Sequence, residues 1–438
     1  MEHRNNQEVP QNCRADRSFV VRGQICQSAS PDRLSCMENS YIPVLDGKVQ
    51  GVFRSLPERF AGLPLADFGD RLVIPGMSDL HLHASQFAFR GLGMDMELLD
   101  WLNTYTFPEE AKFQDAAYAE LAYSGFVQAL RRSFTTRAAI FATVHPAATL
   151  LLMEQLEASG LRTLVGKVNM DRNCPAEVRE SGAETALRET EAWLCEARER
   201  FERTTPILTP RFVPTCSDEL MAGLGRLREK YGLAVQSHLS ENFGEIAWVQ
   251  ELSPASRFYG DAYHRFGLFG GGYPCLMAHC VHSGEAELAL MQENGVFIAH
   301  SPESNMNLAS GVAPVSRYLA LGLKVGLATD VAGGSHESLF RAVTHAIQAS
   351  KLRWRLLDER VKPLSFAQAF WLATAGGGAF FGKVGRFETG YEFDALVLDD
   401  EKLFHPQPLD LPSRLERMVY LADERNLTAK YVAGERLF

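Results

Sequence analysis

The feature that most constrains the fold is a repeated rhythm between Leu72 and about Gly382, in which short apolar runs alternate with longer helical patterns. This rhythm is typical of strand–helix units whose parallel strands are covered by the connecting helices. Strands are expected at residues 72–81, 136–143, 163–169, 206–212, 234–239, 275–279, 296–300 and 323–329. Helical patterns occupy residues 114–132, 183–203, 217–230 and 284–294, and Ser217 and Ser283 are candidate N-caps. Eight strand–helix units predict an α/β fold of the (β/α)8 TIM-like barrel type.

The segments on either side of this region have a β pattern. Short β-like runs occur between residues 18 and 71, where Asp46-Gly47 is a hairpin signal, and again at 385–398 and 430–438. We therefore expect a small β-sandwich domain built from the N- and C-terminal segments. Its halves are residues 1–71, of which 1–17 form a loose polar tail, and residues 383–438. We expect the barrel, residues 72–382, to be inserted between them.

Composition argues against several classes of protein. The 438 residues are 46% hydrophobic and 22% charged, as in ordinary globular proteins, and the net charge of -10 argues against nucleic-acid or anionic-membrane partners. The eight cysteines form no CxxC pair, which indicates free thiols in a reducing compartment. Residues 1–10 lack the apolar segment of a signal peptide, and no run reaches the ~20 apolar residues of a transmembrane helix. We therefore expect a cytoplasmic protein.

Polar side chains follow several predicted strands at the point where each strand ends. His81 and His83 are spaced i, i+2 at the end of the first strand, so they point to the same face. His238 and His279 end the fifth and sixth strands, and Asp330 follows the eighth. Because active sites of such barrels lie at the carboxyl ends of the strands, these side chains are expected to converge on one mouth. Imidazole nitrogens with one carboxylate suit Zn²⁺, and Fe²⁺ is an alternative.

Glu241 lies three residues after His238, where it could reach a metal-bound water or a substrate nitrogen. Each of these residues also has a structural interpretation. Glu241 could stabilise a helix start, Asp330 could cap the turn before Gly333-Gly334, and His279 could be a buried strand histidine. The fourth strand offers no lysine or carboxylate to bridge a second ion, and Lys167 is misplaced for that role, so one metal ion is expected.

Longer stretches around these residues carry a family resemblance. They are Pro75-Gly76, His81-Leu-His-Ala-Ser-Gln86, Leu99-Asp-Trp-Leu102, Tyr105-Thr-Phe-Pro-Glu109, Phe141-Ala-Thr143, Thr209-Pro-Arg-Phe212, Ser237-His-Leu-Ser-Glu-Asn242, Ser304-Asn305 and Thr329-Asp-Val-Ala-Gly-Gly334. From about residue 70 onward the chain resembles the amidohydrolase superfamily and, within it, the guanine deaminase family. It departs from the narrower pattern at Ser133-Phe134 and at Ser301-Pro-Glu-Ser304, which are loop or packing positions.

The resemblance implies a homodimeric zinc enzyme that hydrolyses guanine to xanthine and ammonia with a zinc-activated water. It implies that the zinc ligands are His81, His83, His238 and Asp330, and that Gln86, Arg211, Phe212, His238 and His279 bind the purine. These residues lead to a mechanistic hypothesis in which Asp330 accepts a proton from the water, Glu241 protonates the ring nitrogen beside C2, and His279 steadies the developing oxygen charge.

Two alternative functions stay open. A deaminase of the same superfamily acting on another purine, a pterin or a triazine would have the same metal ligands, so only a panel of substrates separates the two. A non-catalytic scaffold with the same fold would usually have lost ligands, whereas this chain retains all of them together with Glu241.

Overall fold

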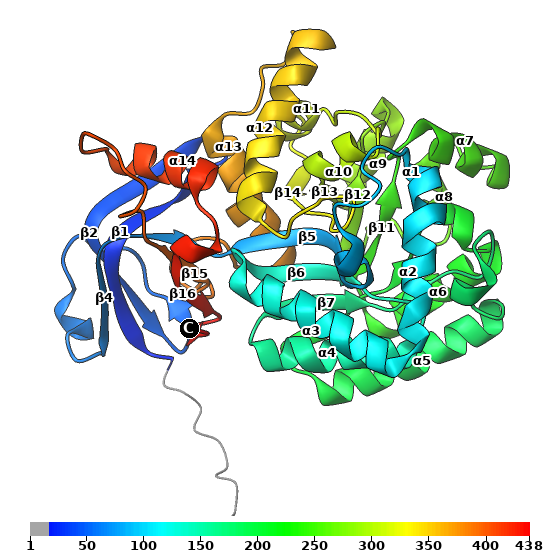
Figure 1. Ribbon diagram of the computed structural model, residues 1–438, viewed down its shortest axis with the longest axis horizontal. Coiled ribbons are helices and arrows are strands. Elements are labelled where there is room, and N and C mark those ends of the chain that lie inside the picture. Colours follow the sequence, from blue (N-terminus) through cyan, green and yellow to red (C-terminus); the bar gives the residue numbers. More distant parts are fainter. Residues whose placement is uncertain (1–16) are drawn as a thin grey trace, which may run out of the picture.

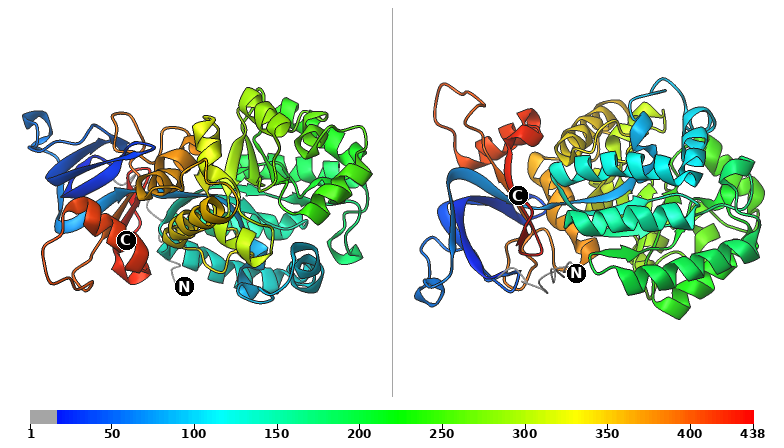
Figure 2. Two further views of the ribbon diagram at one scale, coloured as in Figure 1. Left: turned by 90° about the horizontal axis from the view of Figure 1, so that it is seen from above. Right: turned by 60° about the horizontal axis from the view of Figure 1, so that its bottom comes forward.

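The structure, a computed structural model, describes residues 17–438. Two parts are visible in Figure 1: a large body of parallel strands and covering helices, and a smaller lobe in which strands from both ends of the chain lie side by side. The views in Figure 2 show the same division. The described residues include only the last residue of the expected tail at 1–17. Cys13 and the region tested for a signal peptide, residues 1–10, lie outside them.

The large body contains two four-stranded parallel sheets. The first consists of β5 (Met77–His83), β6 (Thr135–Phe141), β7 (Arg162–Gly166) and β9 (Thr204–Pro206). The second consists of β11 (Val235–Leu239), β12 (Cys275–His279), β13 (Phe297–His300) and β14 (Lys324–Leu327). The short strands β8 (Val168–Asn169) and β10 (Thr209–Pro210) pair with each other. All of these ladders are parallel, as the strand–helix rhythm predicts.

Backbone hydrogen bonds join the two sheets at both of their edges. At one edge Leu208 donates to Ala234 O and accepts from Gln236 N, at 3.0 and 2.9 Å. At the other edge Asp330 N donates to His81 O at 2.8 Å, and His83 N donates to Val331 O at 2.8 Å. The arrangement is therefore TIM-barrel-like, and the second junction lies where the predicted metal ligands meet.

Helices surround these strands, and α1 (Leu98–Trp101) lies at the carboxyl-terminal end, where it contributes to the pocket described below (Figure 1). The other α-helices of this body are α2 (Phe107–Ala111), α3 (Ala116–Arg132), α4 (Pro146–Ser159), α5 (Ala183–Arg200), α6 (Asp218–Tyr231), α7 (Phe243–Leu252), α8 (Tyr259–His264), α9 (Glu285–Asn294), α10 (Pro302–Asn307), α11 (Val315–Ala320), α12 (Leu339–Leu356) and α13 (Phe366–Trp371). Among the helices of this body that the structure describes, none is long and apolar enough to cross a membrane. Ser217 is the N-cap of α6, accepting from Leu220 N at 3.1 Å, as predicted. The prediction for Ser283 was wrong, because Gly284 occupies the N-cap of α9.

The smaller lobe contains one seven-stranded sheet in the order β17-β16-β15-β4-β1-β2-β3. Its strands are β1 (Phe19–Ser30), β2 (Arg33–Leu45), β3 (Lys48–Val49), β4 (Leu65–Pro75), β15 (Ala395–Leu398), β16 (Leu427–Val432) and β17 (Glu435–Arg436), and α14 (Leu411–Leu421) packs against β1 and β2. The Asp46-Gly47 turn joins β2 to β3, with both residues at positive φ. Phe19 on β1 contacts Tyr431 on β16 at 5.4 Å although two strands separate them in the sheet, so the sheet curls around one apolar core. The expected two-sheet sandwich stays a prediction.

The predicted strand at 72–81 proved to be two strands that belong to different sheets. β4 ends at Pro75 in the smaller lobe, and β5 begins at Met77 in the parallel body. Gly76 lies between them, where a Cβ atom would stand 2.4 Å from Thr136 Oγ1 and 2.9 Å from Asp394 Cβ. The buried Arg137 on β6 binds Asp394, which precedes β15, through two hydrogen bonds of 2.7 and 2.9 Å. The chain therefore crosses directly from one lobe into the strand that carries His81 and His83.

Apolar side chains fill the interior between the parallel strands. Leu80, Ala139, Ile207, Leu276, Ala278, Ala299 and Ala328 pack there with Phe297 and Phe380, whose rings meet edge to face at 5.2 Å. Polar side chains gather beside this apolar layer at the carboxyl-terminal ends of the strands, so these ends carry the candidate site.

Candidate metal centre and active site

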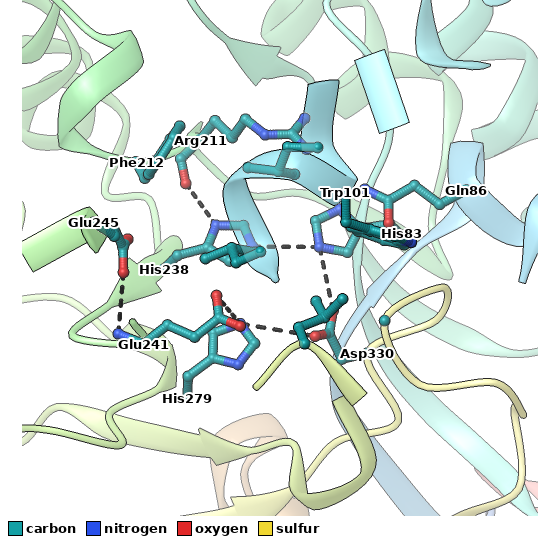
Figure 3. A pocket seen from close by; sticks show the side chains of 14 residues that line it. His83, Gln86, Trp101, Arg211, Phe212, His238, Glu241, Glu245, His279 and Asp330 are labelled. Atoms are coloured by element: carbon teal, nitrogen blue, oxygen red, sulfur yellow. Dashed lines mark hydrogen bonds and ion pairs between the residues drawn. The ribbon is translucent and has the colours of Figure 1, made fainter. Parts of the chain in front are cut away.

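A pocket opens at the carboxyl-terminal ends of the parallel strands (Figure 3). Its lining combines titratable, hydrogen-bonding and apolar side chains: His83, Gln86, Leu98, Trp101, Leu102, Arg211, Phe212, His238, Glu241, Glu245, His279, Leu308, Asp330 and Gly333. Each predicted site residue except His81 lines this pocket. His81 is buried beneath it, with its Nε2 atom 3.2 Å from that of His83.

Three imidazole nitrogens converge at the floor of the pocket. His81 and His83 project from β5 to the same side, as the two-residue period of a strand requires. Nε2 of His238, from β11, lies 3.3 Å from Nε2 of His83. Nδ1 of His238 donates to the carbonyl oxygen of Arg211 at 2.7 Å, so the neutral ring presents the lone pair of Nε2 to the other two histidines. Converging imidazole nitrogens are typical of a metal site.

Asp330 completes the cluster from the segment after β14. Its Oδ1 atom lies 3.2 Å from Nε2 of His81 and 3.4 Å from Nε2 of His83. Two overlapping groups of ligand atoms, each within 4.8 Å of one another, therefore form: His81, His83 and His238, and His81, His279 and Asp330. Asp330 and His279 have positive φ values of 49° and 70°, a conformation that costs non-glycine residues energy and often marks functional sites.

Burial sets the charge state of these ligands. It lowers the pKa of His83 to about 3 and that of His238 well below its usual value, which keeps both rings neutral and able to coordinate a metal. Burial alone would raise the pKa of Asp330, but the neighbouring His81 and His83 hold it well below its usual range. Neutral imidazoles beside an ionised carboxylate are the donor set that Zn²⁺ prefers, so these residues fit such an ion.

Glu241 stands beside this cluster as a buried acid. Its Oε2 atom lies 3.4 Å from Nε2 of His279, and its Oε1 atom accepts a hydrogen bond of 2.9 Å from Ser310. Burial and the charge of Asp330 raise the pKa of Glu241 to about 8, so near neutral pH it holds a proton that it can donate. The backbone N–H of Glu241 donates to Glu245, which fixes the turn that carries it.

The side of the pocket away from the metal cluster is built from hydrogen-bond donors and an aromatic ring. Gln86, in the turn after β5, and Arg211, after β10, both bind the buried carboxylate of Glu110. Phe212 lies beside His238, with ring centroids 6.4 Å apart. Leu98, Trp101 and Leu102 add apolar surface to the same pocket. A flat heterocycle with an acceptor group on one edge suits this combination.

Some residues that support the site were not identified from the sequence. Glu110, Glu245 and Asp79 are buried carboxylates that bind site residues or their backbone. Asn305 accepts from Nδ1 of His279 at 2.9 Å, and it lies in a stretch noted only for family resemblance. Glu110 follows directly after the Tyr105–Glu109 stretch of the family resemblance, and this position was the one sequence signal that could have identified it. Lys167 binds Glu180 away from the pocket, consistent with its exclusion as a metal-bridging group.

Comparison with known proteins places this site in a family. A family model described as the amidohydrolase family matches residues 72–437, and the chain therefore belongs to the amidohydrolase family. Its similar relatives are guanine deaminases. That of Rattus norvegicus is 37% identical over 380 residues, covering 83% of this chain and 82% of its own. That of Escherichia coli (strain K12) is 35% identical, covering 85% and 84%.

A solved structure gives a similar result. The crystal structure of guanine deaminase from C. acetobutylicum, which has guanine bound in its active site, superimposes with a TM-score of 0.93. It is 48% identical to this chain and covers 96% of this chain and 100% of its own.

Proposed function

We infer that this chain hydrolyses guanine to xanthine and ammonia. The observation that carries this function is the similarity, at 48% identity over 96% of the chain, to a guanine deaminase with guanine bound in its active site. The pocket has the three elements that such a reaction needs: a candidate metal cluster, a buried acid, and donors for an oxo group.

We propose that the metal ion is a single Zn²⁺ held by His81, His83, His238 and Asp330, with Fe²⁺ as the alternative. The converging Nε2 atoms and the tautomer of His238 support this assignment. When bound, the ion lowers the pKa of water and so supplies a nucleophile at neutral pH. His279 also lies close to the carboxylate of Asp330, at 3.8 Å, where it could bind the ion or orient the attacking water.

The protein's own groups would move the protons. Asp330 accepts a proton from the attacking water, whose oxygen forms a bond to C2 of guanine. Glu241 gives its proton to the ring nitrogen beside C2. His279, whose Nδ1 donates to Asn305, offers Nε2 as an acceptor that steadies the new hydroxyl group. The proton left on the new oxygen passes to the ionised Glu241, the amine leaves as ammonia with a proton from Asp330 or Glu241, and the C2–N bond breaks to give xanthine. The raised pKa of Glu241, about 8, supports its role as the acid.

Recognition of the purine would come from the opposite side of the pocket. Gln86 and Arg211 offer N–H donors, which match the O6 carbonyl of guanine and match the amino group of adenine poorly. Phe212 would pack against the ring.

We also propose the larger organisation that the sequence predicts. The two sheets would close into one (β/α)8 barrel at 72–382, inserted into a β-sandwich domain formed by residues up to 71 and from 383 onward. The hydrogen bonds at both sheet edges and the curled seven-stranded sheet support this proposal. A homodimer in the cytoplasm is proposed from the family resemblance, and light scattering coupled to size-exclusion chromatography tests the oligomeric state.

The function is tested by incubating guanine with zinc-loaded protein while following the ultraviolet spectrum and assaying ammonia. Formation of xanthine with an equimolar amount of ammonia is the expected result. The same assay with adenine, an aminopterin and an aminotriazine tests the alternative substrates. If the protein turns over one of these compounds but not guanine, its membership of the family stands and the proposed substrate is wrong.

A further inference from the structure

The side chain of Glu110 connects two residues that we have placed around the substrate. Glu110 lies on α2, and its side chain is 3% exposed. Its Oε1 atom accepts from Gln86 Nε2 at 3.0 Å, and its Oε2 atom accepts from Arg211 Nη1 at 2.6 Å. It is not among the residues that line the pocket. It therefore contacts the two donors from behind.

The contact with Glu110 fixes which end of the Gln86 amide is the donor. An ionised carboxylate only accepts hydrogen bonds, so it must face the NH₂ group of Gln86 and not the carbonyl. The carbonyl Oε1 of Gln86 in turn accepts from the backbone N–H of Ala332 at 3.3 Å. One N–H of the amide is thereby used, and the second is left to donate to a ligand in the pocket.

The same carboxylate holds the guanidinium of Arg211. The pair is buried on both sides, and the guanidinium also packs over the ring of Phe107, which is on α2 with Glu110, at 5.2 Å. Because only Nη1 contacts Glu110, the other N–H groups of the guanidinium are left for a ligand. Glu110 also balances the charge of Arg211, which lets a positive group sit in the buried wall of the pocket.

We propose that Glu110 is a positioning residue that makes the site selective for purines with an oxo group at C6. It would do so by presenting Gln86 and Arg211 as two donors to one acceptor edge. This inference rests on the proposed function, and extends it to a residue that does not touch the substrate. Without the negative charge, the Gln86 amide is free to rotate and the guanidinium loses its anchor.

The neighbouring Glu109 supplies a matched control. It is also buried and lies on the same helix, but it binds Lys112 at 2.6 Å and the hydroxyl of Tyr118, both away from the pocket. Glu109→Gln removes a buried carboxylate from α2 without touching Gln86 or Arg211. Any loss that follows only from destabilising this helix should appear in both variants.

The experiment compares wild type, Glu110→Gln and Glu109→Gln, all zinc-loaded. KM and kcat are measured for guanine, and inhibition constants for hypoxanthine, which carries the C6 oxo group, and purine, which lacks it. For Glu110→Gln we expect KM for guanine to rise about 10-fold or more and the preference for hypoxanthine over purine to fall by a similar factor, with kcat changed less. Glu109→Gln should keep the wild-type preference.

Equal weakening of hypoxanthine and purine in Glu110→Gln would overturn the inference, because a general packing defect acts on both ligands. If Glu110→Gln does not fold, Glu110→Asp is measured in its place. It keeps the charge but is one methylene shorter, so a reduced preference is expected and an unchanged one overturns the inference. Failure of the wild type to turn over guanine would instead refute the proposed function, so the two failures are distinguishable.

Discussion

The carbonyl oxygen of Arg211 lies 2.7 Å from Nδ1 of His238, while the guanidinium of the same residue binds Glu110. One residue thus contacts both halves of the pocket. Its backbone sets the tautomer of a candidate metal ligand, and its side chain lines the pocket with N–H donors. The position of the candidate metal cluster and that of the Arg211 guanidinium are therefore coupled through a single backbone segment.

Replacing His83 should remove the metal ion. His83→Ala deletes an imidazole whose Nε2 lies close to those of both His81 and His238, so we expect loss of bound zinc and of guanine turnover. Metal content by mass spectrometry and turnover are measured together. His405→Ala, at an exposed position in the smaller lobe, is the control and should retain both. Full metal occupancy in His83→Ala would refute the ligand assignment.

Replacing Glu241 should separate metal binding from catalysis. Glu241→Gln keeps the shape of the side chain and the contact with Ser310 but removes the titrating acid. We expect a metal content like that of wild type and a fall in kcat of about 10²-fold or more. Near-normal turnover in this variant would show that the proton comes from elsewhere.

The stability of the metal-free protein should depend on pH through Glu241. Burial and the charge of Asp330 raise its pKa from 4.5 to about 8 in the folded state, so the folded chain holds this proton longer than the unfolded chain. Its contribution to stability is complete below about pH 4.5 and is lost as pH rises through about 8.

Urea unfolding of chelator-treated wild type and Glu241→Gln across that pH window measures the effect. As pH rises through this window, the free energy of unfolding of the wild type should fall relative to that of the variant, by up to about 1.4 kcal/mol per pH unit. Identical pH profiles for the two proteins would mean that Glu241 is already ionised in the folded state.

Replacing Arg211 should weaken substrate binding more than catalysis. Arg211→Ala removes the guanidinium but keeps the carbonyl that accepts from His238, so the metal cluster should persist. We expect KM for guanine to rise about 10-fold or more with a smaller change in kcat, measured by steady-state kinetics. Arg172→Ala, whose guanidinium binds Val213 O outside the pocket lining, provides the comparison. A fall in kcat alone would contradict a binding role.

Much of the site was predictable because strand periodicity and the ends of parallel strands place side chains by simple rules. His81, His83, His238, His279 and Asp330 follow those rules, and the structure brings them together. Glu110 does not, because its role depends on α2 passing behind two loops that are distant in sequence. No local pattern encodes that contact.

Strand boundaries were less predictable where the backbone changes partners without a change in hydrophobicity. The run 72–81 is apolar throughout its first half, so the break at Gly76 is determined by the close approach of Thr136 and Asp394. The 206–212 run likewise divides into β9 and β10, because Leu208 between them forms backbone hydrogen bonds with Ala234 and Gln236, at the start of β11. The prediction for Ser283 missed by one residue, because α9 begins only after Gly284.

The passage from β4 through Gly76 into β5 also bears on the order of events during synthesis. β4 pairs along one edge with β15, which lies far later in the chain, with Ala395 opposite Pro75. β5, which carries His81 and His83, therefore emerges from the ribosome long before β15, the strand that pairs with β4 on the amino-terminal side of β5. The nascent chain must keep that edge of β4 from pairing with other molecules until most of the protein has been translated.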